Sequence, residues 1–147
     1  MDAEKIGKVA SVAKSAEHKT AQILKESQEA HQQKCGQLDQ LVTFKQEYEA
    51  NLGAQGRASI AARQLQDYRL FLSKLDQAIQ QQTQAVQLSL ESLDAVREEW
   101  LSKNRHRTSL DTLLDRTHRE WLQKMEKIEQ KEADESTLTR SLTKNEV

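Results

Sequence analysis

The sequence predicts an all-α protein, a long antiparallel two-helix coiled-coil hairpin, and three observations lead to that prediction. Apolar residues occupy most seventh positions from Leu65 to Leu142, which is typical of a helix packed along a supercoiled seam. The 147-residue chain contains no proline, a residue that costs about 3 kcal/mol inside a helix. Gly53 and Gly56 lie between two helical patterns, and a short turn between helices makes them antiparallel.

The first helix is predicted over residues 3–52, with Asp2 as its N-cap. Apolar and small residues follow a three-four spacing from Ile6. An extra step of four after Lys34 predicts a stutter, which relaxes the supercoil locally. The seam positions predicted for this helix are Ile6, Val9, Ala13, Ala16, Thr20, Ile23, Ser27, Ala30, Lys34, Leu38, Leu41, Lys45, Tyr48 and Leu52.

The turn is predicted over residues 53–58, with Gly53 as a left-handed helix C-cap. Ser59 is the predicted cap of the second helix, which spans residues 59–135 and precedes a loose C-terminal tail. The whole chain, residues 1–147, is then a single hairpin. Folding at the turn is expected to place Leu38 against Leu75.

On this register the first helix is exhausted opposite about residue 106, so the seam of the second helix continues without a mate. One interpretation of this overhang is a frayed, partly disordered tail. The other is a partner-binding helix, because exposed apolar stripes generally have a partner. The apolar residues assigned to that role are Leu113, Leu114, Trp121, Met125 and Ile128.

Composition excludes several classes of function. The net charge is −1 and no segment forms a basic patch, so a nucleic-acid partner is not expected. Strictly apolar runs are far too short to span a membrane, and the N-terminus lacks the apolar core of a signal peptide. The lone Cys35 agrees with a reducing compartment. We therefore expect a cytoplasmic protein.

The sequence offers no catalytic constellation. It has no glycine-rich phosphate loop and no paired cysteines at metal-binding spacing, and no two histidines lie four residues apart. Cys35 is interpreted as a small buried or half-buried residue, without a histidine near it in sequence, and not as a nucleophile. The prediction is a protein that is not an enzyme and binds neither a metal nor a cofactor.

Two rows of residues share one spacing near the turn. Phe44 and Phe71, one in each row, lie off the narrow seam, so packing of the two helices does not require them. They either widen the core near the turn or form an exposed aromatic platform for a partner. The first row is Gln37, Leu41, Phe44 and Tyr48, and the second is Phe71, Leu75, Ala78 and Gln82.

These rows resemble the flagellar export protein FliJ family. The matching segments are Leu41-x-x-Phe44-Lys45-Gln46-Glu47-Tyr48 and Tyr68-x-x-Phe71-Leu72-x-x-Leu75-x-x-Ala78-Ile79-x-x-Gln82, and Glu99-Trp100 and Gln130-Lys131-x-x-Asp134-Glu135 follow downstream. The resemblance covers nearly the whole chain, and it is carried by the order and spacing of these segments together.

The resemblance implies a two-helix coiled coil similar to the central stalk of rotary ATPases. It implies binding to the flagellar export ATPase hexamer and to the cytoplasmic domain of the membrane export gate, with escort of export chaperones. We expect the ATPase contacts at the open end of the hairpin, on the N-terminal turn and on the overhang residues Leu113, Leu114, Trp121, Met125 and Ile128. The protein would then be peripheral to the inner face of the cell membrane, through protein partners only. Gln82 stands where the family has a histidine, and glutamine can still hydrogen-bond. The implied gate contacts are Gln37, Leu41, Phe44, Tyr48, Phe71, Leu75, Ala78 and Gln82.

Two other functions remain open at this point. A stalk protein of a virulence-type injection system would share the architecture. A purely structural coiled-coil tether would be expected to have a continuous seam in both helices and no loose aromatic residues near the turn. The aromatic rows and the unmatched overhang favour the two export stalks over the tether.

Overall fold

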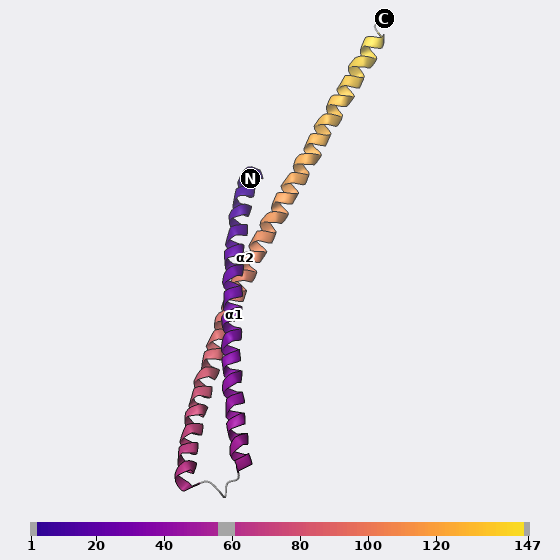
Figure 1. Ribbon diagram of the computed structural model, residues 1–147. Coiled ribbons are helices and arrows are strands. Elements are labelled where there is room, and N and C mark those ends of the chain that lie inside the picture. The colour runs from indigo at the N-terminus through magenta and orange to yellow at the C-terminus, as the bar shows by residue number, and fades with distance from the viewer. Residues whose placement is uncertain (1–2, 56–60, 146–147) are drawn as a thin grey trace. The chain divides into compact units, whose positions relative to one another are not determined.

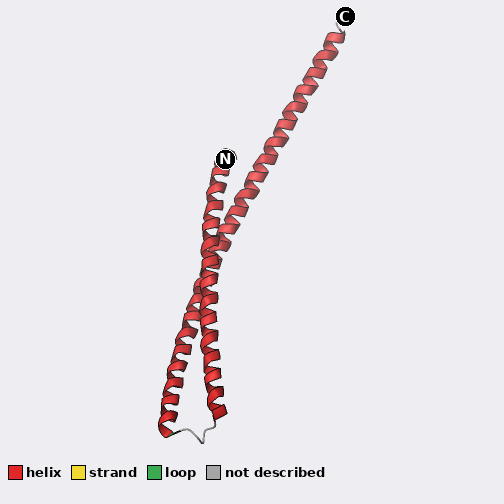
Figure 2. Ribbon diagram, in the orientation of Figure 1, coloured by secondary structure: helices red, strands yellow, loops and turns green. Residues whose placement is uncertain are grey.

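The computed structural model describes residues 3–55 and 61–145, and all of these except residue 61 are helical (Figure 2). Helix α1 spans Ala3–Gln55 and helix α2 spans Ala62–Asn145 (Figure 1). No strand occurs among the described residues. The predicted fold class, an all-α antiparallel two-helix coiled-coil hairpin, is confirmed.

The helices contribute to two compact units. The hairpin unit is His18–Leu101, and within it α1 and α2 lie side by side (Figure 1). The Phe44 ring of α1 contacts the Phe71 ring of α2 there. The terminal unit combines Met1–Glu17 with Ser102–Val147. Within the terminal unit Arg107 of α2 donates a hydrogen bond from Nε to the carboxylate of Glu17.

Burial along α1 alternates by four and three residues without interruption. In the terminal unit Ile6, Ala10 and Ala13 are 2%, 7% and 6% exposed. In the hairpin unit the buried or half-buried positions continue as Thr20, Leu24, Ser27, His31, Lys34, Leu38, Leu41, Lys45, Tyr48 and Leu52.

The predicted stutter after Lys34 is therefore wrong. Val9 and Ile23 were expected on the seam, but their side chains are 46% and 53% exposed. The neighbouring Ala10 and Leu24 take those places, because each adjacent pair offers two apolar residues and only one of them continues the four-three spacing. His31 replaces Ala30 in the same way.

The seam of α2 follows the predicted row as far as Leu114. Leu75 and Leu93 are buried, and so is the polar Ser89. Trp100 is half-buried, and its indole N–H is buried without a hydrogen-bond partner in the part of the chain that the structure describes. In the terminal unit the row becomes exposed at Trp121.

The pairing of the helices differs from the predicted register by about one helical turn. Folding at the predicted turn would place Gln82 opposite about residue 30 of α1. Gln82 instead donates hydrogen bonds to the Lys34 carbonyl and the Gln37 side chain, four to seven residues further along α1. As a result α1 covers more of α2. The last half-buried side chain of α2 is Thr117, and all described side chains from residue 118 onward are exposed. The predicted start of the overhang near residue 106 is wrong, and residues 118–145 are the uncovered arm.

The helix ends also differ from expectation. Gly53 lies inside α1 and has no left-handed φ, so the predicted C-cap at Gly53 is wrong. Helix α2 begins at Ala62, and its Leu65 N–H donates to the Ala61 carbonyl at 3.1 Å. It remains helical through Asn145, beyond the predicted end near residue 135. The predicted caps Asp2 and Ser59, and Gly56 of the turn, lie outside the described residues.

Leu24 and Ile23 provide a direct test of the α1 register. Leu24→Ala should lower the free energy of unfolding by about 2 kcal/mol, because it removes a seam side chain. Ile23→Ala should change it by less than about 0.5 kcal/mol, because that side chain lies largely in water. Urea unfolding followed by circular dichroism measures both. A larger loss for Ile23→Ala than for Leu24→Ala would restore the register with the stutter.

Candidate functional site

An aromatic cluster, defined as Phe44, Tyr48, Tyr68 and Phe71, contains both phenylalanines and both tyrosines of the chain. The Tyr48 ring stacks on Tyr68, with centroids 4.7 Å apart and planes 9° apart. It also lies 4.6 Å from Phe71, and Phe44 meets Phe71 edge-on at 6.1 Å. The Tyr68 hydroxyl donates a hydrogen bond to the Tyr48 carbonyl at 3.4 Å. The cluster therefore joins α1 to α2 near the turn.

The exposure of the two phenylalanines combines both sequence interpretations. Their rings contact one another, as in a widened core, yet Phe44 is 49% exposed and Phe71 is 37% exposed. Leu75, at 7% exposed, belongs to the core and has little surface for a partner. The cluster thus presents a partly exposed aromatic face whose rings contact one another across the two helices.

The eight residues predicted to contact the export gate form one patch along the hairpin unit, which we call the eight-residue patch. Phe44 and Phe71 connect its two rows at one end. At the other end Gln82 Nε2 donates to Gln37 Oε1 at 3.3 Å and to the Lys34 carbonyl at 2.9 Å. Leu41 and Ala78 are half-buried between these ends. The structure therefore brings the two rows together.

A cross-helix ion pair lies beside the patch. Lys45 Nζ is 2.6 Å from an Asp76 carboxylate oxygen and 4.0 Å from a Glu49 oxygen. The hydrogen bond to Asp76 raises the pKa of Lys45 above its ordinary value of 10.5, with smaller charge effects from Asp76 and Glu49. Because the folded-state pKa is raised, any stabilisation from this pair is present below pH 10.5 and is lost as the pH rises through the raised pKa.

A polar group crosses the seam in the middle of the hairpin unit. His31 Nδ1 is 3.1 Å from the Ser89 hydroxyl, and His31 Nε2 is 3.6 Å from the Cys35 sulfur. The expectation that Cys35 has no histidine beside it is therefore wrong, because one helical turn of α1 separates the two residues. Among the described residues no group of three His, Cys, Asp or Glu side chains is placed to hold a metal ion.

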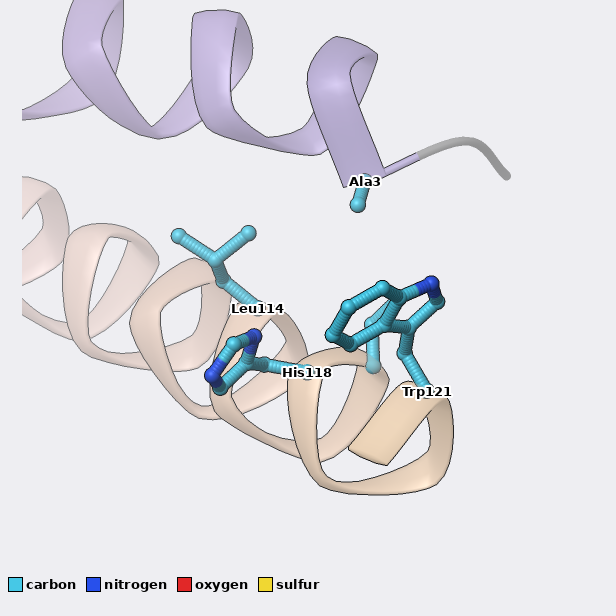
Figure 3. A pocket seen from close by; sticks show the side chains of 5 residues that line it. Ala3, Leu114, His118 and Trp121 are labelled. Atoms are coloured by element: carbon cyan, nitrogen blue, oxygen red, sulfur yellow. The ribbon is translucent and has the colours of Figure 1, made fainter. Parts of the chain in front are cut away.

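The terminal unit contains a hollow of about 500 Å³ where α1 begins (Figure 3). Ala3 faces it from α1, and Leu114, Thr117, His118 and Trp121 line it from α2. The Trp121 ring stacks on His118 with centroids 6.2 Å apart. Trp121, expected to lack any mate, therefore lies at the border between covered and uncovered α2.

The residues expected from the sequence to contact the ATPase divide at this border. Leu114 is half-buried and Leu113 is 38% exposed, and both precede the uncovered arm. Trp121, Met125 and Ile128 lie on the arm and are 52%, 41% and 44% exposed. Of the five assigned residues, these three lie on the arm, and their spacing of four and three places them in one apolar stripe.

Sequence reasoning did not assign Tyr68, Lys45 or Asp76 to the site. Lys45 was predicted as a seam position and Tyr68 as part of a segment that resembles the family, and neither prediction specifies what the side chain contacts. The stacking of Tyr68 on Tyr48 and the reach of Lys45 to Asp76 depend on the helix register, which differs from the predicted one.

Comparisons with known proteins agree on one family. The model of a family described as "Flagellar FliJ protein" matches residues 2–146. The Flagellar FliJ protein of Escherichia coli (strain K12) is 27% identical over 126 residues, which cover 86% of each chain. The Flagellar FliJ protein of Salmonella typhi is also 27% identical over 126 residues, with the same coverage. No solved structure matches the chain with significance.

No helix of the described residues has the length and hydropathy needed to cross a membrane.

Asp76→Asn tests the ion pair at the edge of the site. It should lower the pKa of Lys45 toward 10.5, because the hydrogen-bonded carboxylate is the main cause of the shift. Titration of the lysine side chains by NMR measures this change. Asp67→Asn, which removes an exposed carboxylate elsewhere on α2, should leave the Lys45 titration unchanged. An identical Lys45 titration in the wild type and Asp76→Asn would contradict the pair.

Proposed function

The chain belongs to the FliJ family of flagellar export proteins, and on that premise we propose that it is a non-enzymatic accessory protein of the export apparatus. It binds the export ATPase hexamer through one surface and the cytoplasmic domain of the membrane export gate through another. Escort of export chaperones is part of the same role. These partners hold it at the inner face of the cell membrane. The observation that carries the proposal is the partly exposed aromatic cluster.

The gate contact is assigned to the eight-residue patch. Aromatic side chains are enriched among the residues that dominate binding energy, and here all four phenylalanine and tyrosine rings lie in one place. Contacts between the rings hold them in position before a partner arrives, so little side-chain entropy is lost on binding. Gln37 and Gln82 supply hydrogen-bonding groups at the other end of the patch.

The ATPase contact is assigned to the uncovered arm. Trp121, Met125 and Ile128 follow one another at helical spacing, so they form a single stripe. This stripe continues the seam that α1 covers up to Leu114. A helix with such a stripe is suited to a groove in a partner.

The alternatives are less well supported. Both relatives carry flagellar names, which favours a flagellar protein over an injectisome stalk. A purely structural tether does not require large apolar side chains that are half exposed near the turn, as Phe44 is.

Phe44→Ala and Phe71→Ala should each weaken binding to the purified gate domain by about 2 kcal/mol, as expected for aromatic residues at the centre of an interface. Each should lower the free energy of unfolding by less than about 1 kcal/mol, because part of each ring is in water. Calorimetry and thermal unfolding measure the two quantities.

Leu70→Ala is the matched control, since Leu70 is 58% exposed and adjacent to Phe71 but outside the patch. It should leave gate binding unchanged. A collapse of the melting temperature in Phe44→Ala and Phe71→Ala, with normal binding per folded molecule, would show that both are core residues only.

Trp121→Ala should reduce stimulation of the partner ATPase several-fold while helicity and melting temperature stay nearly unchanged, because this side chain is 52% exposed. Steady-state ATP hydrolysis and circular dichroism provide the readouts. Gln123→Ala, on another face of the same arm, is the control and should stimulate normally. A large loss of thermal stability in Trp121→Ala would instead indicate a structural role at the hollow beside Ala3.

A further inference from the structure

The two edges of the hairpin unit differ in charge. Residues taken every seven positions back from Phe44 to Ile23 and forward from Phe71 to Ser92 form one edge, and none of them is charged; the next step along α2, Glu99, is charged and ends the edge. The equivalent row on the other edge of the same unit carries Glu49, Arg69, Asp76 and Arg97. We call the first the uncharged edge; its residues are Ile23, Ala30, Gln37, Phe44, Phe71, Ala78, Ala85 and Ser92.

The observed contacts align the residues of this edge. Because α1 and α2 run antiparallel, each step of seven back along α1 is matched by a step of seven forward along α2 (Figure 1). Phe44 meets Phe71, and Gln37 meets Gln82 one turn past Ala78. The same register places Ala30 across from Ala85. The uncharged edge therefore continues well beyond the eight-residue patch.

Side-chain size varies along the edge. Half-exposed phenylalanines lie at one end. At the other end Ile23 is 53% exposed, and Leu88, one turn after Ala85 on the same side of α2, is 65% exposed. Between these ends Ala30 is exposed and Ala85 is half-buried. Small residues in the middle allow the backbone of another helix to approach closely, and the large residues at both ends can hold it.

One charge lies at the centre of this surface. Each helix has one row of seam residues next to this edge, and Lys34 is the charged residue in these two rows. The rows are Ser27, Lys34, Leu41 and Tyr48 on α1 and Tyr68, Leu75, Gln82 and Ser89 on α2. Lys34 is half-buried, lies one turn from Ala30, and its carbonyl accepts the Gln82 hydrogen bond. An apolar partner with one carboxylate at its middle would therefore match the edge in charge as well as in shape.

We propose that the uncharged edge binds one amphipathic helix of the gate's cytoplasmic domain, whose apolar stripe carries a single acidic residue opposite Lys34. From Phe44 to Ile23 the edge is about 30 Å long, the length of a helix of about 20 residues. The inference rests on the proposed gate contact and adds Ile23, Ala30, Ala85 and Leu88 to it. The eight-residue patch is then one end of a longer site.

Ala30→Glu and Ala85→Glu test the added part of the edge with the full chain and the purified gate domain. Each introduces a longer, charged side chain in the middle of the edge and should weaken binding at least about tenfold by calorimetry. Gln32→Glu places the same charge on the opposite edge of α1 and should bind within about twofold of wild type. Ala30 is exposed, so Ala30→Glu keeps the test valid even where Ala85→Glu disturbs the fold.

The outcomes separate this inference from the proposed function. Normal binding by Ala30→Glu and Ala85→Glu, with loss of binding by Phe44→Ala, would overturn the longer site and leave the gate contact standing. Normal binding by Phe44→Ala as well would overturn the gate contact itself. Should sedimentation of the chain alone show a dimer that Ala30→Glu dissociates, with gate binding unaffected, the edge would be a self-association surface and the inference would be wrong.

Discussion

Each helix of this protein has only the other helix to pack against, so stability depends on one narrow seam of side chains. That seam contains polar residues that are buried, among them Thr20 and Ser89, each below a tenth exposed. Such residues must be hydrogen-bonded, and hydrogen bonds are directional. The contacts from His31 to Ser89 and from Gln82 to Lys34 therefore help to determine which residues of α1 meet which residues of α2. The aromatic cluster and the Lys45–Asp76 pair both depend on that register.

The seam of α2 was predictable from sequence and the seam of α1 was not, for a physical reason. Along α2 Leu65 and Leu93 stand between polar neighbours, and the row at every seventh position keeps one phase as far as Leu114. Along α1 adjacent apolar pairs such as Ile23 and Leu24 fit two phases equally well. Which residue of each pair packs on the seam depends on the partner helix, and the periodicity of one segment carries no information about that helix. The predicted pairing and the predicted start of the uncovered arm came from folding at residues 53–58, and both shifted because α1 continues to Gln55 and α2 begins only at Ala62.

The candidate site was predicted in part. The position of Phe44 and Phe71 off the seam correctly indicated partial exposure, because the residues of that region keep their helical spacing whatever the pairing is. The contacts between helices could not be predicted in the same way. Tyr68 reaches Tyr48 and Lys45 reaches Asp76 only in the observed register. The two surfaces assigned to partners also lie in different units of the chain, the eight-residue patch in the hairpin unit and the uncovered arm in the terminal unit.

The two tryptophans lie in contrasting surroundings, and this gives the protein an intrinsic optical reporter for each unit. Trp100, in the hairpin unit, has an indole N–H that is shielded from water. Trp121, in the terminal unit, is 52% exposed beside His118. An indole in an apolar environment fluoresces at shorter wavelength than one in water, and water-soluble quenchers reach only the second kind. Emission from the unlabelled chain can therefore distinguish opening of the seam from a change at the base of the arm.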